Sequence, residues 1–335
     1  MISPSQFTAI NPPIRIGMVG TGHGAKARAE ALKGSERGLL VAIAGHTPEK
    51  TEEFSQIFQT EVSPSWGQLL EREDLDLAIV SSINKEHGAM VRAALENNLH
   101  VVVEYPLSLE PAEAEELIAL AKTKNKLLHV EHIELLGGLH NAVKKWLPAI
   151  GKVFYARYKT ISPKHPAPRR WSYQPSLFGF PFVGALSRLH RFTDLFGEVA
   201  AVSCESQFWQ GSEDFYKACL CNARLKFTNG IIGECVYGKG ETFWQRENMF
   251  AIYGEEGTLI FTPKEGQLIK GDKTEILEVG SRRGLFAKDT TMVLERLLVE
   301  TPLYVTPQAS LYALKVADAT RRSADNNGQW VIVNR

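Results

Sequence analysis

The sequence predicts an α/β protein with a doubly wound, parallel N-terminal sheet, followed by an α+β domain with a large, mainly antiparallel sheet. Two observations predict this fold class. Apolar, β-rich runs alternate with helical segments over the first 130 residues. After about residue 150, short segments that alternate polar and apolar residues follow one another through links containing Gly or Asn. We therefore expect two domains, 1–130 and 131–335.

The first domain is expected to hold five strands separated by helices. Its strands read as continuous apolar runs, which is typical of a parallel sheet covered on both faces. Ser108 is expected to cap a helix that carries Pro111 in its first turn. The expected strands are 14–19, 39–44, 77–81, 100–103 and 127–130, and the other clear helices are 25–32 and 87–97.

The second domain is expected to expose one face of its sheet to water. Segments such as VFYARYKTI, ACLCNARLKF and GTLIFT alternate in the way that such a sheet requires. Its other face is expected to be covered by helices near 180–196, 286–300 and 308–322.

Composition excludes several classes of protein. The 38 basic residues balance 38 acidic ones, which argues against a nucleic-acid-binding or membrane-surface protein. The start, MISPSQFTAINPP, lacks the basic and apolar parts of a signal peptide, and no apolar run approaches the ~18 residues of a membrane span. We expect a soluble, cytoplasmic protein. Its four cysteines show no C-x-x-C spacing and are expected to be reduced core thiols: Cys204, Cys219, Cys221 and Cys235.

A glycine-rich turn between the first strand and the first helix predicts a dinucleotide site. Gly20 allows the tight turn, Gly22 lets a pyrophosphate approach the backbone, and Ala25 keeps helix and strand close. The helix N-terminus supplies amide donors to the anion. The alternative is a glycine turn in another doubly wound fold. The residues assigned to the cofactor here are Gly20, Thr21, Gly22, His23, Gly24 and Ala25.

The end of the second strand favours NADPH over NADH, although NADH remains a weaker possibility. An acidic residue there would hold the ribose 2′-hydroxyl, but the chain offers His46 and Thr47, which can donate to a 2′-phosphate. Lys50 or Arg28 is expected to supply positive charge. The alternative is that these two cations lie on solvated helix surface.

Two strand-end segments are similar to those of the Gfo/Idh/MocA oxidoreductases. Asn84 and His87 match the N-x-x-H segment that lies beside the nicotinamide ribose in that family, the alternative being a helix cap and a polar histidine. The segment VVVEYP matches the family's strand-end E-K-P, with Tyr105 in place of the lysine used in alcohol–ketone chemistry. We assign Glu104 to both the cofactor and the substrate.

The other two catalytic groups of the family's sugar dehydrogenases are also replaced. An aspartate and a histidine four residues apart are expected on the helix FPFVGALSRLHRFTDLFG, but Val183 and Ser187 occupy those positions. Removal of an alcohol proton therefore has no evident general base.

Basic and aromatic residues instead predict an anionic, flat, conjugated substrate. The expected aromatic walls are Trp171, Tyr173, Phe178, Phe180, Phe243 and Trp244, the alternative for each being a core position. The residues assigned to substrate are Glu104, His132, His190, Arg191, Arg170, Trp171 and Arg283, with the pairs Arg169–Arg170 and Arg282–Arg283 in loops.

The segment HVEHIE holds His129, Glu131, His132 and Glu134, but its alternation of faces on a strand argues against a metal site. Glu131 and His132 are expected to line the cleft or to hold neighbouring groups by hydrogen bonds.

The chain as a whole resembles the biliverdin reductase branch of the same family. The segments VVVEYPL, LLHVEHIELLGG, SRLHRFTDLFG and VGSRRGLF carry this resemblance. It implies NADPH-dependent reduction of biliverdin IXα to bilirubin at the C10 methine, with the catalytic arginine at Arg188 and Tyr105 orienting the substrate or donating a hydrogen bond. Two alternatives stay open: a sugar or polyol dehydrogenase of the family, and a non-catalytic module that binds NADP or a tetrapyrrole.

Overall fold

The computed structural model describes residues 10–211 and 214–334, so most of the N-terminal segment considered above lies outside the described residues. Within them, no helix is both long and apolar enough to cross a membrane. The chain forms two compact units. One contains the described residues up to Ile133 together with Gly284–Leu311, and the other contains Glu134–Arg283 and the residues from Tyr312 onward. This division differs from the single boundary predicted after residue 130, because Gly284–Leu311 belongs to the first unit.

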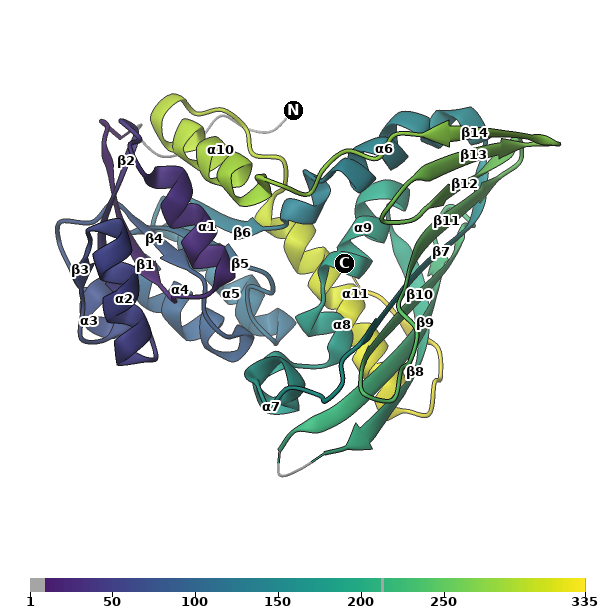
Figure 1. Ribbon diagram of the computed structural model, residues 1–335, viewed down its shortest axis with the longest axis horizontal. Helices are drawn as coiled ribbons and strands as arrows, with labels where there is room; N and C mark the ends of the chain where they lie inside the picture. Colours follow the sequence, from purple (N-terminus) through teal and green to yellow (C-terminus); the bar gives the residue numbers. More distant parts are fainter. Residues whose placement is uncertain (1–9, 212–213, 335) are drawn as a thin grey trace. The chain divides into compact units, whose positions relative to one another are not determined.

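The first unit is built on a six-stranded sheet in the order β3-β2-β1-β4-β5-β6 (Figure 1). All its strand pairs are parallel, which confirms the predicted doubly wound sheet. Only the short β3 was not expected. The strands are β1 (Ile14–Val19), β2 (Gly38–Ala44), β3 (Glu61–Val62), β4 (Leu77–Val80), β5 (His100–Glu104) and β6 (Leu128–Glu131).

The helices of this unit follow the strands in sequence. They are α1 (His23–Leu32), α2 (Pro48–Phe58), α3 (Trp66–Leu70), α4 (His87–Glu96), α5 (Pro111–Thr123) and α10 (Leu285–Val299), with the short 3₁₀ helices η1 (Asn84–Glu86) and η2 (Ile133–Leu135). The expected cap of α5 is corrected. Glu110 is the N-cap residue, while Ser108 accepts from the Glu110 amide at 3.0 Å and donates to Glu113.

Helix α10 corrects the prediction that residues 286–300 cover the second sheet. Val293, Leu294 and Leu297 of this helix are buried in the same core cluster as Ala25 and Ala29 of α1. The apolar face of α10 therefore finds its partners in the first unit, beside the helix that follows the glycine turn. A sequence pattern shows that a helix has an apolar face, but not which of two sheets that face will meet.

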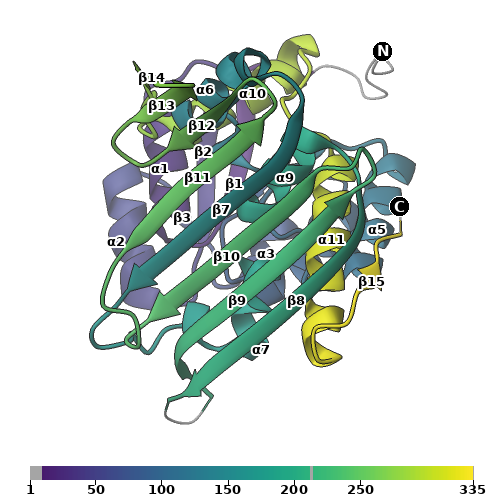
Figure 2. The same ribbon diagram turned by 90° about the vertical axis from the view of Figure 1, so that its right-hand side faces the viewer.

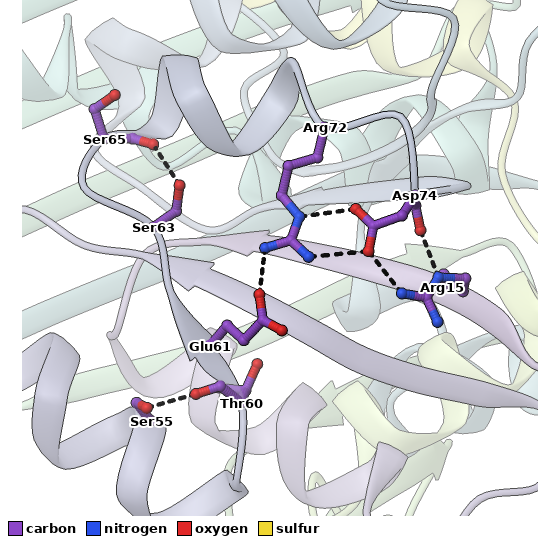
Figure 3. A network of polar contacts seen from close by, with 8 residues as sticks. All are labelled: Arg15, Ser55, Thr60, Glu61, Ser63, Ser65, Arg72 and Asp74. Carbon is purple, nitrogen blue, oxygen red and sulfur yellow. Dashed lines mark hydrogen bonds and ion pairs between the residues drawn. The ribbon is translucent and has the colours of Figure 1, made fainter.

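A group of ion pairs ties together the amino edge of the parallel sheet (Figure 3). Arg72 pairs with Glu61 at 2.6 Å and with Asp74 at 2.8 Å, and Asp74 also pairs with Arg15 at the start of β1 at 2.6 Å. Hydrogen bonds from Arg72 and Arg15 hold the pKa of Asp74 well below its usual range. Parallel α/β sheets bind ligands at their carboxyl edge, so this network is structural.

The second unit contains a nine-stranded sheet in the order β14-β13-β12-β11-β7-β10-β9-β8-β15, seen face-on in Figure 2. Its pairs are antiparallel except for β10 with β7, which confirms a mainly antiparallel sheet. The strands are β7 (Val153–Pro163), β8 (Val199–Gln210), β9 (Tyr216–Phe227), β10 (Ile232–Gly240), β11 (Glu247–Gly254), β12 (Gly257–Phe261), β13 (Gly266–Lys270), β14 (Lys273–Leu277) and β15 (Val331–Ile332).

Helices cover one face of this sheet. Phe192 packs against Phe227 and Phe250, and the Cys204 amide donates to Ser323 at 2.8 Å. All four cysteines are free and buried, as expected. The helices are α6 (Gly138–Trp146), α7 (Pro175–Phe178), α8 (Pro181–Gly184), α9 (Ser187–Phe196) and α11 (Pro307–Asp325), with η3 (Leu147–Ile150) and η4 (Trp171–Tyr173). The single helix expected over 180–196 is divided, because Ala185 and Leu186 lie between α8 and α9.

Candidate functional site

The glycine turn has the backbone geometry that a dinucleotide pyrophosphate requires. Gly20 has φ +108°, and a Cβ at this position would lie 2.0 Å from the carbonyl oxygen of Ser81. Gly22 is the N-cap of α1, and a Cβ there would meet no atom within 4 Å. The helix N-terminus is thus left open to an anion where a side chain would fill the space. The residues present fit the cofactor's phosphates.

Glu104 lies directly against this turn. A Cβ at Gly24 would be 1.9 Å from Oε1 of Glu104, so only glycine lets the carboxylate come this close. Glu104 is half-buried at the end of β5, and its register partner on β6 is Glu131. The structure therefore places the predicted Glu104 beside the predicted glycine residues, although the sequence motif gives no reason for Gly24.

The end of β2 leaves one of the two predicted cations available to a 2′-phosphate. His46 and Lys50 are exposed, and the Thr47 side chain does not cap α2. Arg28 corrects both interpretations offered for it. It is 1% exposed, and its Nη1 lies 2.6 Å from Oδ2 of Asp289 in α10. A guanidinium buried in this way neither reaches a cofactor nor lies on solvated helix surface.

Asn84 and His87 lie where the family segment was expected, but His87 is engaged by the backbone. Its Nδ1 lies 2.7 Å from the carbonyl oxygen of Pro106, and its Nε2 lies 3.1 Å from that of Ser82. The side chain is fully buried. His87 thus holds the chain after β5, which carries Tyr105, against the chain after β4, and its predicted place beside the cofactor stays a prediction. Asn84 is buried in η1.

Tyr105 is supported from behind by His132. The two rings stack with centroids 5.0 Å apart and planes 7° apart, and His132 Nε2 lies 2.8 Å from Oγ of Ser310. His132 is fully buried whereas Tyr105 is half-buried. These contacts favour the alternative that His132 holds neighbouring groups by hydrogen bonds, while its predicted contact with substrate stays a prediction.

A buried group of charges lies behind Glu104 and Tyr105. Asp289 accepts from His129 Nε2 and from the Tyr304 hydroxyl, both at 2.8 Å, and pairs with Arg28. Glu131 is buried beside it, and burial raises the pKa of Glu131 to about 8 although the Arg28 charge acts in the opposite direction. Because Arg28 pairs with Asp289, the pKa of Asp289 is lowered while that of Glu131 is raised. The described residues contain no cluster of three or more His, Cys, Asp or Glu arranged to hold a metal.

Arg188 lies at the start of α9 in the second unit. It is half-buried, with its guanidinium carbon 4.9 Å from the ring centroid of Tyr237 and its Nε 3.4 Å from Oγ1 of Thr160. Helix α9 is anchored to α6 because Asp194 accepts from His140 and Lys144, each at 2.7 Å. The arginine is thus held, half-buried, on a helix that is anchored to its neighbour.

The two other residues on α9 that were assigned to substrate, His190 and Arg191, are buried. Arg191 is 2% exposed, pairs with Glu134 at 3.6 Å and lies over the ring of Tyr158. His190 is 2% exposed, and burial lowers its pKa to about 4. Both side chains face the interior because residues 190 and 191 fall on the buried side of the helix. Their burial does not favour the predicted contacts of His190 and Arg191 with substrate, which stay predictions.

The loop residues divide into exposed and buried groups. Arg170 and Arg283 are exposed and Trp171 is half-buried, so these three remain available to a ligand. Arg282 is instead paired with Glu134. Among the expected aromatic walls, Tyr173 and Phe178 are core residues at 1% and 7% exposure, while Trp244 is 86% exposed.

Sequence reasoning missed Lys239 on β10. This lysine is 7% exposed, and its Nζ lies 3.8 Å from the ring centroid of Phe178 and 4.8 Å from that of Tyr173. It donates to the carbonyl oxygen of Ser172 at 2.5 Å. The only sequence signal is a lysine at a position that the strand alternation assigns to the buried face, two residues after Tyr237.

The fold and the two site regions define a nicotinamide-dependent oxidoreductase. The model "Oxidoreductase family, NAD-binding Rossmann fold" matches residues 14–132, and "Oxidoreductase family, C-terminal alpha/beta domain" matches residues 148–333. The chain belongs to this Gfo/Idh/MocA family.

Within the family, the chain is similar to biliverdin reductases. It is 48% identical to biliverdin reductase from Synechocystis sp. PCC 6803, solved in complex with biliverdin and NADP⁺, over 93% of this chain and 99% of that one, with a TM-score of 0.92. It is 25% identical to mouse biliverdin reductase A over 91% of this chain and 94% of the mouse protein. A levoglucosan dehydrogenase, 20% identical with a TM-score of 0.83 over 96% and 100% of the two chains, shares the fold.

Proposed function

We propose that this protein is an NADPH-dependent biliverdin reductase that converts biliverdin IXα to bilirubin. The observation that carries the proposal is the 48% identity over 93% of the chain to an enzyme solved with biliverdin and NADP⁺. The residues support it independently, since Tyr105, Val183 and Ser187 replace the groups that an alcohol dehydrogenase of this family needs. The four buried free thiols suit a reducing compartment, and we place the protein in the cytoplasm.

NADPH would be held at the glycine turn and at the end of β2. The open backbone at Gly22 would receive the pyrophosphate, and the exposed His46 and Lys50 with the half-buried Thr47 would supply donors and charge for the 2′-phosphate. Glu104 borders the turn, and the Asn84 segment borders the next strand end. NADPH supplies the hydride when it is bound.

Reduction of a bilin needs an electrophilic carbon and a proton donor rather than an alcohol base. The C10 methine accepts the hydride, and a pyrrolic nitrogen accepts the proton. Negative charge develops on the conjugated system as the hydride arrives. The permanent positive charge of Arg188 stabilises this negative charge. Because the pKa of arginine is high, direct donation of its proton is demanding, and electrostatic stabilisation is the main role of Arg188. The proton reaches the pyrrolic nitrogen through water or a propionate.

Tyr105 has an orienting role in this proposal. Its ring is fixed by the stack on His132, so the hydroxyl is held in place at the end of β5. It can donate one hydrogen bond to substrate without changing its protonation. Arg170, Trp171 and Arg283 are the predicted substrate residues that remain accessible, and the arginines suit propionates.

The test is a spectroscopic assay with the purified protein, NADPH and biliverdin. We expect biliverdin absorbance to disappear while bilirubin absorbance appears, and deuteride from 4-deuterated NADPH to enter the C10 position. A panel of polyols with NADP⁺ serves as the control and should give no NADPH. Turnover of a polyol without loss of biliverdin would establish the dehydrogenase alternative, and tight bilin binding without turnover would establish the non-catalytic one.

A further inference from the structure

Lys239 is a buried cation that the proposed chemistry does not use. Its side chain projects from β10 into a box of four aromatic rings. The ring centroids of Phe178, Tyr173, Tyr216 and Tyr237 lie 3.8, 4.8, 5.4 and 5.8 Å from its Nζ. An ammonium among aromatic faces is stabilised by their quadrupoles, which partly offsets the loss of hydration.

The same ammonium fixes the backbone of a loop. Its Nζ donates to the carbonyl oxygen of Ser172 at 2.5 Å, and the Tyr216 hydroxyl donates to the same oxygen at 3.1 Å. Ser172 is the middle residue of η4, which is flanked by Arg170 and contains Trp171. Two donors from the sheet thus hold the short segment that carries the accessible arginine and tryptophan assigned to substrate.

Lys239 also shares a ring with Arg188. Tyr237 lies two residues earlier on β10, so both side chains project from the same face of the strand. The Tyr237 ring has Arg188 at 4.9 Å and Lys239 at 5.8 Å from its centroid. The lysine therefore packs against the ring on which the catalytic arginine rests.

We propose that Lys239 is a positioning residue for the bilin: its charge holds η4 in place, and thereby sets where Arg170 and Trp171 meet the substrate. The inference rests on the proposed function. Loss of the charge should weaken binding of biliverdin, because η4 loses its charged hydrogen bond and its cation–π contacts together. The hydride transfer step itself should change little, since Arg188 keeps its own contacts with Thr160 and with the Tyr237 ring.

The environment of Lys239 makes this role dependent on pH. Burial lowers its pKa to about 8, with the charges of Arg188 and Arg170 acting in the same direction. Four titratable groups near it keep their protons at that pH. Burial raises the pKa of Cys219, Cys221, Tyr173 and Tyr216 further above neutrality, and arginines stay charged. The affinity for biliverdin should therefore fall as pH rises through about 8.

The test compares Lys239→Met and Lys239→Arg with the wild-type protein. For Lys239→Met at pH 7 we expect the KM and Kd for biliverdin to rise about tenfold, as for loss of one charged hydrogen bond, while kcat stays within about twofold. Lys239→Arg keeps the charge and a donor, so it should bind within about threefold of wild type and lose the change near pH 8. Lys226→Met is the matched control, because Lys226 is exposed on β9 and lies 4.1 Å from the Trp330 ring centroid.

The outcomes separate the two proposals. A wild-type protein that neither binds nor reduces biliverdin would overturn the proposed function, and this role with it. An active wild-type protein whose Lys239→Met variant binds biliverdin as tightly as wild type would overturn only the positioning role. A Lys239→Arg variant that retained the wild-type dependence of KM on pH would also overturn the positioning role. This second result decides the question even if the methionine variant does not fold.

Discussion

Replacement of Arg28 by methionine should destabilise the first unit without impairing recognition of NADPH. The guanidinium is 1% exposed, lies 2.6 Å from Asp289 and 3.1 Å from Oγ1 of Thr290, and packs over the Phe286 ring. Methionine keeps much of the volume but removes the charge. Asp289, fully buried, would keep only its hydrogen bonds from His129 and Tyr304.

The magnitude follows from leaving a buried carboxylate without its cation. Removal of one partner of a buried ion pair costs about 3–5 kcal/mol in the free energy of unfolding. Burial alone would raise the pKa of Asp289, yet the Arg28 charge and His129 hold it well below the usual range. This group therefore contributes stability above the ordinary aspartate pKa of about 4, and the contribution is lost as pH falls below that value. The difference between wild type and Arg28→Met should shrink in acid.

The assay is urea unfolding at pH 7, followed by a probe of the first unit, with Arg37→Met as the control. Arg37 pairs with Glu295 of the same helix α10 at 3.1 Å, but the two side chains are 55% and 36% exposed. The control should lose no more than about 1 kcal/mol. A stabilising role of the buried pair would be refuted if Arg28→Met lost no more stability than Arg37→Met and raised the KM for NADPH more than the KM for NADH. Arg28 would then bind the 2′-phosphate, and its pair with Asp289 would contribute little to stability.

Three further predictions concern single residues. Lys50→Met should raise the KM for NADPH by about tenfold and leave that for NADH unchanged, because it removes one phosphate contact; equal effects on both would exclude that contact. Tyr105→Phe should lower kcat less than tenfold, since only one hydrogen bond is lost; a loss as large as that of Arg188→Ala would make Tyr105 a proton donor. Because the pKa of Glu131 is raised to about 8, the folded state binds more protons than the unfolded state between about pH 4.5 and 8, and the free energy of unfolding should fall as pH rises through this range. Glu131→Gln should flatten this dependence in urea unfolding, and an unchanged dependence would assign it to another group.

Local patterns predicted the parts of the structure that depend on neighbours in sequence. The apolar runs gave the parallel strands, the alternation gave the antiparallel sheet, and the Gly20–Ala25 turn lies between β1 and α1 as the motif requires. The chain also brings Glu104 to this turn, as the common edge of parallel strands implies.

The errors concern groups whose partners are distant in sequence. Arg28 looked like surface or a phosphate ligand because Asp289 lies 261 residues further along the chain. Arg191 and His190 were assigned to substrate from residue type, but both are 2% exposed, and Arg191 pairs with Glu134, 57 residues earlier in the chain. Lys239 was not noticed, since its aromatic partners come from η4, α7, β9 and β10, which no local pattern brings together.

The central claim is that this chain reduces biliverdin with Arg188 stabilising the charge that develops during hydride transfer. Single-turnover bleaching of biliverdin by excess protein saturated with NADPH tests it most directly, for wild type and for Arg188→Ala. We predict a loss of about 10²–10³ in the bleaching rate constant, as for removal of one preorganised charge stabiliser, with the Kd for biliverdin rising less than about tenfold. A rate constant within about threefold of wild type would contradict the claim.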